Sequence, residues 1–99
     1  MQIEKADRSE VIGTSLRGAV DIGYSELVEK LGEPHDTEGD KTKAEWAFVV
    51  DGVIVTIYDY KNHGRSLHSI RDWHVGGKES DALDAAEKLL GMTVQSENW

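Results

Sequence analysis

Apolar and polar residues alternate most regularly between residues 44 and 60, where two strand-like runs flank Asp51-Gly52. This pair predicts a hairpin with a two-residue type I′ turn, because both turn residues must adopt positive φ. The turn also fixes which side chains face each other. The face that we assign to the core pairs Val50 with Val53, Phe48 with Val55, Trp46 with Ile57 and Ala44 with Asp59. The second, mixed face pairs Val49 with Ile54, Ala47 with Thr56, Glu45 with Tyr58 and Lys43 with Tyr60.

Two other segments space their apolar residues at the intervals of an amphipathic helix. The first covers residues 24–31, and the second covers residues 81–90. Each begins near a serine and ends at a glycine, which are common residues at the two ends of a helix. The predicted N-caps are Ser25 and Ser80, and the predicted terminators are Gly32 and Gly91.

Weaker patterns complete the predicted fold. Residues 14–22 alternate loosely around Gly18, which leaves a bulged strand and a loop as open alternatives. Residues 67–75 predict a third strand that ends at Gly76-Gly77. Residues 1–13 form an extended lead-in segment or a short edge strand, and residues 92–99 form a tail that includes a possible short strand at Thr93-Val94. We therefore expect one α+β domain over residues 1–99, with an antiparallel sheet of three to four strands and two helices on one face (β-α-β-β-β-α).

The chain of 99 residues carries a net charge of −8 and contains no cysteine. A nucleic-acid binder normally needs a basic surface, so we expect no direct DNA binding. The absence of cysteine excludes thiolate metal sites and suits a reducing cytoplasm. Residues 1–7 lack the apolar core of a signal peptide, and no apolar run approaches the ~20 residues that cross a bilayer. We expect a cytoplasmic protein with no membrane partner.

Basic residues gather in one window, residues 61–78, although the rest of the chain is acidic. Such a window predicts a surface that tolerates anions. Within it, Asp72 and His74 are two residues apart on one strand face. That spacing suits either a structural hydrogen bond or a general-base pair. We expect no metal and no cofactor. The basic residues of the window are Lys61, Arg65, Arg71 and Lys78.

Two sets of side chains are candidates for binding. Aromatic residues with polar tips commonly anchor interfaces and can stack on nucleobases; this set comprises Tyr58, Tyr60, Trp73 and His74. It adjoins Glu45 and the end of the hairpin where Asp59 closes the core face. The second set is the acidic loop, Asp36, Glu38 and Asp40. Its spacing superficially matches the start of a calcium loop, but the required glycine and final carboxylate are missing, so we expect a solvated loop.

As an ordered series, several segments between residues 14 and 77 resemble small proteins of tailed bacteriophages whose role is not established. The segments are Tyr24–Val28, Leu31–Pro34, Gly39–Lys41, Ala44–Trp46, Asp51-Gly52, Thr56–Lys61 and Asp72–Gly77. The resemblance implies a viral protein that acts in the cytoplasm of a bacterial host. Small acidic phage proteins without catalytic motifs commonly block host defence by binding, as anti-CRISPR proteins do.

Three functions follow as hypotheses. The first is a non-enzymatic inhibitor that binds a host defence protein or complex stoichiometrically, because lysines and arginines that hold phosphates also hold carboxylates. The second is a sponge for a nucleotide immune signal, built on the 61–78 window and completed between the subunits of a homodimer. The third is a small hydrolase that uses Asp72 and His74. The candidate binding residues are Tyr58, Tyr60, Trp73, His74, Arg71, Arg65, Glu45, Asp36, Glu38 and Asp40.

Overall fold

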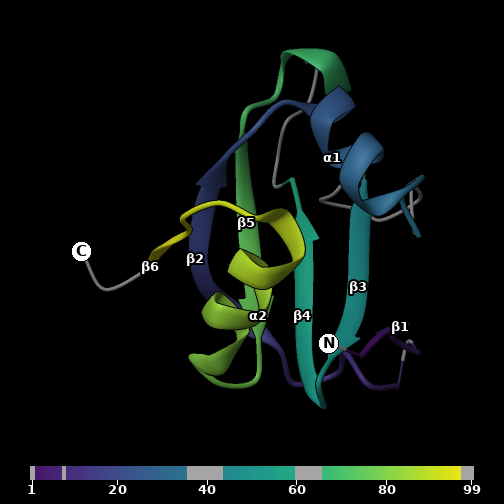
Figure 1. Ribbon diagram of the computed structural model, residues 1–99, viewed down its shortest axis with the longest axis vertical. Coiled ribbons are helices and arrows are strands. Elements are labelled where there is room, and N and C mark those ends of the chain that lie inside the picture. Colours follow the sequence, from purple (N-terminus) through teal and green to yellow (C-terminus); the bar gives the residue numbers. More distant parts are fainter. Residues whose placement is uncertain (1, 8, 36–43, 60–65, 97–99) are drawn as a thin grey trace.

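The computed structural model describes residues 2–7, 9–35, 44–59 and 66–96. These residues form one antiparallel sheet of six strands in the order β1-β3-β4-β5-β2-β6, with two α-helices (Figure 1). The elements are β1 (Ile3–Lys5), β2 (Ser15–Asp21), α1 (Tyr24–Leu31), β3 (Glu45–Val50), β4 (Val53–Tyr58), the 3-10 helix η1 (Leu67–Ser69), β5 (Asp72–Gly77), α2 (Asp81–Leu90) and β6 (Gln95–Ser96). The predicted α+β class is confirmed, but the predicted count of three to four strands is wrong.

The central hairpin has the predicted turn and register. Asp51 and Gly52 adopt φ of 50° and 84°, as a type I′ turn requires. β3 and β4 pair from Val50 with Val53 at the turn to Glu45 with Tyr58 at the far end. The Asp-Gly pair therefore determines which face of both strands is buried.

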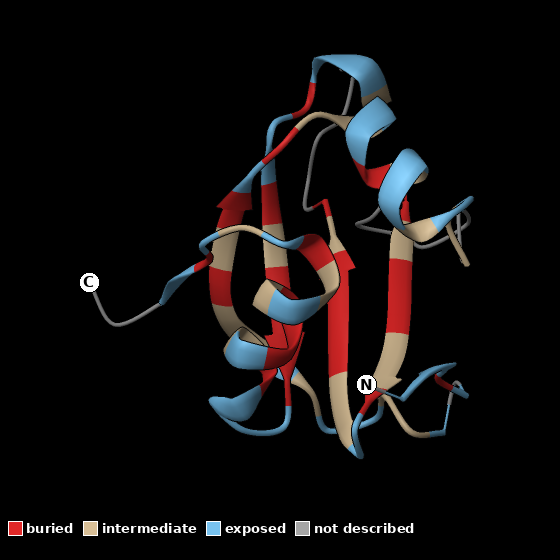
Figure 2. Ribbon diagram, in the orientation of Figure 1, coloured by how far each residue is buried: buried red, intermediate tan, exposed pale blue. Residues whose placement is uncertain are grey.

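The hydrophobic core lies between the sheet and the two helices, which cover the same face (Figure 1). Their inward sides are buried and their outward sides are exposed (Figure 2). Phe48 and Val53, predicted as core, are partly buried and pack against the core. The sheet contributes Val20, Trp46, Val50, Val55, Ile57, Trp73 and Val75, and the helices contribute Leu27, Ala82, Ala85, Ala86 and Leu90.

The two additional strands are the short edges of the sheet, and the sequence analysis offered them only as alternatives. β1 lies within the predicted lead-in and pairs with β3, and β6 pairs with β2. The predicted strand at Thr93-Val94 is wrong, because β6 begins at Gln95. Two or three residues are too few to show alternation, so only the long-range pairing defines these strands.

β2 confirms the bulged-strand alternative. Its register with β5 shifts between Leu16 and Gly18. The guanidinium of Arg17, the residue in the bulge, donates to the carbonyl oxygens of Gly77 and Lys78. The bulge therefore positions the Arg17 guanidinium for hydrogen bonds within the fold.

The third predicted strand is wrong at both ends. Residues 67–69 form a 3-10 turn, because the N–H and Oγ of Ser69 both donate to the carbonyl of Ser66. β5 instead continues through Gly76 and Gly77, which were expected to end it. A Cβ on Gly77 would collide with the Cβ of Ala82. These glycines thus let neighbouring groups approach the strand closely.

Both helices lie where predicted, but their N-termini differ in detail. The N-cap of α1 is Gly23 and not Ser25, so that prediction is wrong. Ser80 does precede α2, although its side chain makes no capping hydrogen bond. The predicted ends are confirmed, since Gly32 and Gly91 follow the helices with φ of 85° and 67°.

The contact between Gly77 and α2 gives a first prediction. Gly77→Ala should lower the free energy of unfolding by about 1–3 kcal/mol, because the added methyl overpacks the interface. Ala82→Gly should relieve that collision, so the double variant should be more stable than the sum of the two single effects. Urea denaturation of the three variants measures this coupling. Strictly additive effects would contradict the close approach of α2.

Candidate functional site

The sheet face away from the helices carries a row of polar and aromatic side chains. Glu45 of β3 lies opposite Tyr58 of β4, and Tyr58 lies opposite His74 of β5. The rings of Tyr58 and His74 meet edge to face with centroids 5.5 Å apart and an interplanar angle of 86°. We call Glu45, Tyr58 and His74 the outer-face row. All three are half-buried, and they are the predicted site residues that the structure brings together.

A glycine on the neighbouring strand makes room for the tyrosine ring. A Cβ at Gly76 would lie 2.5 Å from Thr56 Oγ1 and 3.2 Å from Tyr58 Cε1. The Tyr58 ring therefore extends over the backbone of β5. The row combines a carboxylate, a phenol and an imidazole, which can hydrogen-bond and stack against a partner.

Trp73 does not belong to this surface, so its assignment as a binding residue is wrong. Successive side chains of a strand point to opposite faces, and Trp73 precedes His74. Its side chain is fully buried on the helix side. There its ring contacts those of Trp46 and Tyr24, with centroids 5.6 Å and 6.1 Å away. Trp73 is a core residue.

The far end of the hairpin is closed by Asp59. The Ala44 N–H donates to Asp59 Oδ1 over 2.9 Å, and Asp59 is fully buried. The core face of the hairpin therefore ends in a buried, hydrogen-bonded carboxylate. Asp59 extends the pairing of the hairpin by a side-chain bond.

The described basic residues of the 61–78 window do not form one surface. Arg71 precedes β5 and Lys78 follows it, so β5 holds them on the order of 20 Å apart. Arg71 Nε donates to Asp21 Oδ1 over 2.9 Å. Both residues line a depression of about 670 Å³, together with Asp72. Two carboxylates beside Arg71 make this depression a poor phosphate site.

Several predicted residues lie outside the described part of the chain. They are Asp36, Glu38, Asp40, Lys43, Tyr60, Lys61 and Arg65.

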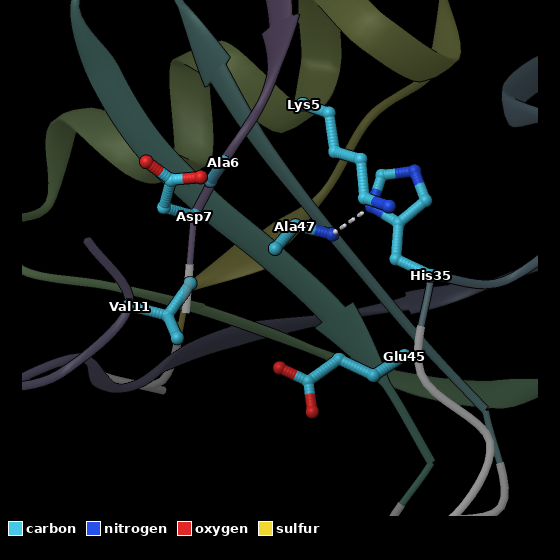
Figure 3. Close-up of a pocket in the computed structure, with 7 residues that line it drawn as sticks. All are labelled: Lys5, Ala6, Asp7, Val11, His35, Glu45 and Ala47. Carbon is cyan, nitrogen blue, oxygen red and sulfur yellow. Dashed lines mark hydrogen bonds between the residues drawn. The ribbon is translucent and has the colours of Figure 1, made fainter. Parts of the chain in front are cut away.

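His35 is a residue that the sequence analysis missed. It lines a depression of about 520 Å³ at the β3 edge of the sheet, with Lys5, Asp7 and Glu45 (Figure 3). Its ring meets that of Phe48 edge to face, with centroids 4.8 Å apart. Burial lowers the pKa of His35 below its ordinary value, and the Lys5 ammonium lowers it further. Nothing in the local sequence around His35 indicates these contacts, because its partners are distant in the chain.

A second missed pair links α1 to η1. Ser25 Oγ lies 3.3 Å from His68 Nδ1, and the His68 ring meets Tyr24 edge to face at 5.2 Å. Both side chains of the hydrogen-bonded pair are exposed. Across the described ranges, no group of three His, Asp or Glu side chains could hold a metal ion.

The exposed side of α1 is acidic. Glu26, Glu29 and Glu33 are all exposed, and Lys30 lies among them. Burial raises the pKa of Tyr24, and the nearby Glu33 carboxylate raises it further. The Glu33 carboxylate therefore lies close enough to Tyr24 to disfavour the ionised phenol.

Comparisons with protein-family models, curated proteins and solved structures give no match to this chain. In the part of the chain that the structure describes, neither helix has the length and apolar character needed to cross a membrane.

The assignments of Trp73 and His74 lead to a second prediction. Trp73→Ala should lower the free energy of unfolding by about 3–5 kcal/mol, since it empties a fully buried site. His74→Ala should lower it by only about 1 kcal/mol, the typical worth of one aromatic contact at a half-buried position. Chemical denaturation compares the two variants. Equal losses would contradict the separation of core and outer face.

Proposed function

We propose that this chain is a small acidic binding protein that inhibits a bacterial defence system in the host cytoplasm by stoichiometric protein–protein binding. The acidic side of α1 is the proposed contact surface. The observation that carries the proposal is the placement of Glu29 in the last turn of α1 and of Glu33 just after its C-cap Gly32, where both are exposed.

Helix stability does not account for these two carboxylates. The C-terminal end of a helix is electrostatically negative and favours cations. Glu33 follows the C-cap Gly32, so it adds a second carboxylate near the same negative end. By contrast, Glu26 lies in the first turn and four residues before Lys30, so its interactions with the helix dipole and with the Lys30 ammonium are both favourable.

Several cations that could offset the acidic charge are already engaged. Arg71 is paired with Asp21, and Arg17 donates to backbone carbonyls. Lys88 lies in the last turn of α2, four residues after Asp84, where it suits the helix dipole. The chain as a whole retains a net charge of −8. These cations of the chain therefore compete little with a basic partner surface for the carboxylates of α1.

The charge density of α1 indicates what kind of surface it would compete for. Residues 26–31 of α1 span about 8 Å at the helical rise. Together with Glu33 they carry three carboxylates and one ammonium, that of Lys30. A single nucleic-acid strand carries about two phosphates over that length, close to the net charge of the segment, and a duplex carries about twice as many. The acidic side of α1 is thus closer to a single strand, which favours a defence protein that holds single-stranded nucleic acid in a basic channel.

The nucleotide-sponge alternative receives less support. It requires Arg71, His74 and Lys78 to converge on phosphates, whereas they lie on different parts of β5 and its ends. The hydrolase alternative has only the spacing of Asp72 and His74 in its favour. We therefore retain the inhibitor as the proposal.

A charge-reversal experiment gives the third prediction. Glu29→Lys/Glu33→Lys should abolish inhibition when the chain is expressed in bacteria with an active CRISPR or restriction system and challenged with phage. Lysine suits the C-terminal end of a helix, so the variant should unfold at the same urea concentration as the wild type or a higher one. Phage plating efficiency is the readout.

The matched control is Glu4→Lys/Glu79→Lys, which changes the net charge equally on exposed residues away from α1. It should inhibit like the wild type. The purified wild-type chain should also bind its target one to one, and binding should weaken as salt screens the contact. Absence of protection against every defence system tested, or equal loss in both variants, would overturn the proposal.

A further inference from the structure

The outer edge of β3 is completed by a histidine instead of a strand. Glu45 and Ala47 occupy positions whose backbone groups point away from β4 and toward the sheet edge. β1 ends at Lys5, and the Ala6 N–H donates to the Ala47 carbonyl over 3.0 Å. His35 pairs with the next two backbone groups. Its backbone N–H donates to the Glu45 carbonyl over 2.8 Å, and its ring Nδ1 accepts the Ala47 N–H over 3.1 Å.

This geometry fixes the protonation state of the ring. An amide N–H can only donate, so Nδ1 must present a lone pair and the neutral ring carries its proton on Nε2. A proton on Nδ1 would place two N–H groups against each other at 3.1 Å. The hydrogen bond would be lost, and the buried Ala47 amide would be left without its acceptor.

The charged groups around the depression that His35 lines come from three segments. Lys5 projects from β1, Asp7 from the connection to β2, and Glu45 from β3. The Lys5 ammonium lies beside the ring, whereas both carboxylates point away from it (Figure 3). Burial, and then the Lys5 ammonium, lower the pKa of His35.

From the three consecutive hydrogen bonds we infer that His35 is a proton-operated latch on the β3 edge. The neutral ring closes the edge, and protonation releases the ring from Ala47. Release frees the Ala47 N–H at the strand edge, and a free donor at such an edge can pair with another chain. The latch is a property of the fold and does not depend on the proposed partner.

The direction of the pH effect follows from the lowered pKa. A ring that is harder to protonate in the closed state than in the open state binds more protons after opening. The latch is therefore fully closed above the ordinary histidine pKa of about 6.5, and it weakens as the pH falls from there toward the lowered pKa. Most carboxylates titrate near pH 4. Their protonation therefore does not cause a change in the upper part of this pH range.

Amide hydrogen exchange tests the latch and gives the fourth prediction. The protection factor of the Ala47 amide, corrected for intrinsic exchange, should fall about tenfold per pH unit between pH 6.5 and the lowered pKa of His35. The amide of Trp46, which pairs with Ile57 across the hairpin, should keep its protection. Nitrogen chemical shifts of the His35 ring should show the Nε2–H tautomer at pH 7.5.

Two asparagine variants are matched controls. His35→Asn retains an acceptor near the Nδ1 position but cannot be protonated, so its Ala47 protection should not depend on pH. His68→Asn removes an exposed histidine on η1 and should behave like the wild type. A flat wild-type profile, the Nδ1–H tautomer, or an unchanged pH dependence in His35→Asn would each overturn the latch; the tautomer decides even if His35→Asn fails to fold.

Discussion

The contact between Trp46 and Trp73 determines where α1 lies on the sheet. Both side chains are fully buried and meet edge to face from β3 and β5, across the intervening strand β4. Tyr24 of α1 packs against both rings. The Trp46 indole N–H donates to the carbonyl of Gly32 over 2.9 Å, which ties the C-terminal end of α1 to the sheet. We call these contacts of Trp46 the anchor of α1. With α1 held in this position, its carboxylates point outward, and His35, which follows the helix, lies at the β3 edge.

The anchor also separates the parts of the molecule that could bind a partner. The acidic side of α1 lies on the outward side of the helix layer (Figure 2). The outer-face row lies on the opposite side of the sheet, because Tyr58 and His74 alternate with the buried Ile57 and Trp73. The latch lies at the edge between the two faces. Binding through α1 therefore leaves the outer-face row accessible to a second contact.

The sequence was sufficient wherever a local signal determined the structure. Asp51-Gly52 predicted the turn and, through it, the pairs of the central hairpin from Val50 with Val53 to Glu45 with Tyr58. Helical spacing predicted α1 and α2, and Gly32 and Gly91 predicted their ends. The sequence was insufficient where the determining contact is distant. β1 exists because it pairs with β3, and β5 runs through Gly77 because Ala82 packs on it.

The candidate site shows the same limit. Strand parity and hairpin register were enough to bring Tyr58 and His74 together, whereas grouping Trp73 with them ignored the alternation of faces. His35 was not among the predicted site residues, since its partners Glu45 and Ala47 are ten or more residues away in the sequence. A histidine that serves as a backbone acceptor leaves no local pattern.

The account rests most on α1 as the contact surface, and hydrogen exchange of the chain in complex with its copurified defence protein tests this directly. We predict that amides of α1 gain protection in the complex, while those of β5 around His74 keep the exchange rates of the free chain. Gained protection around Tyr58 and His74, with α1 unchanged, would contradict the account.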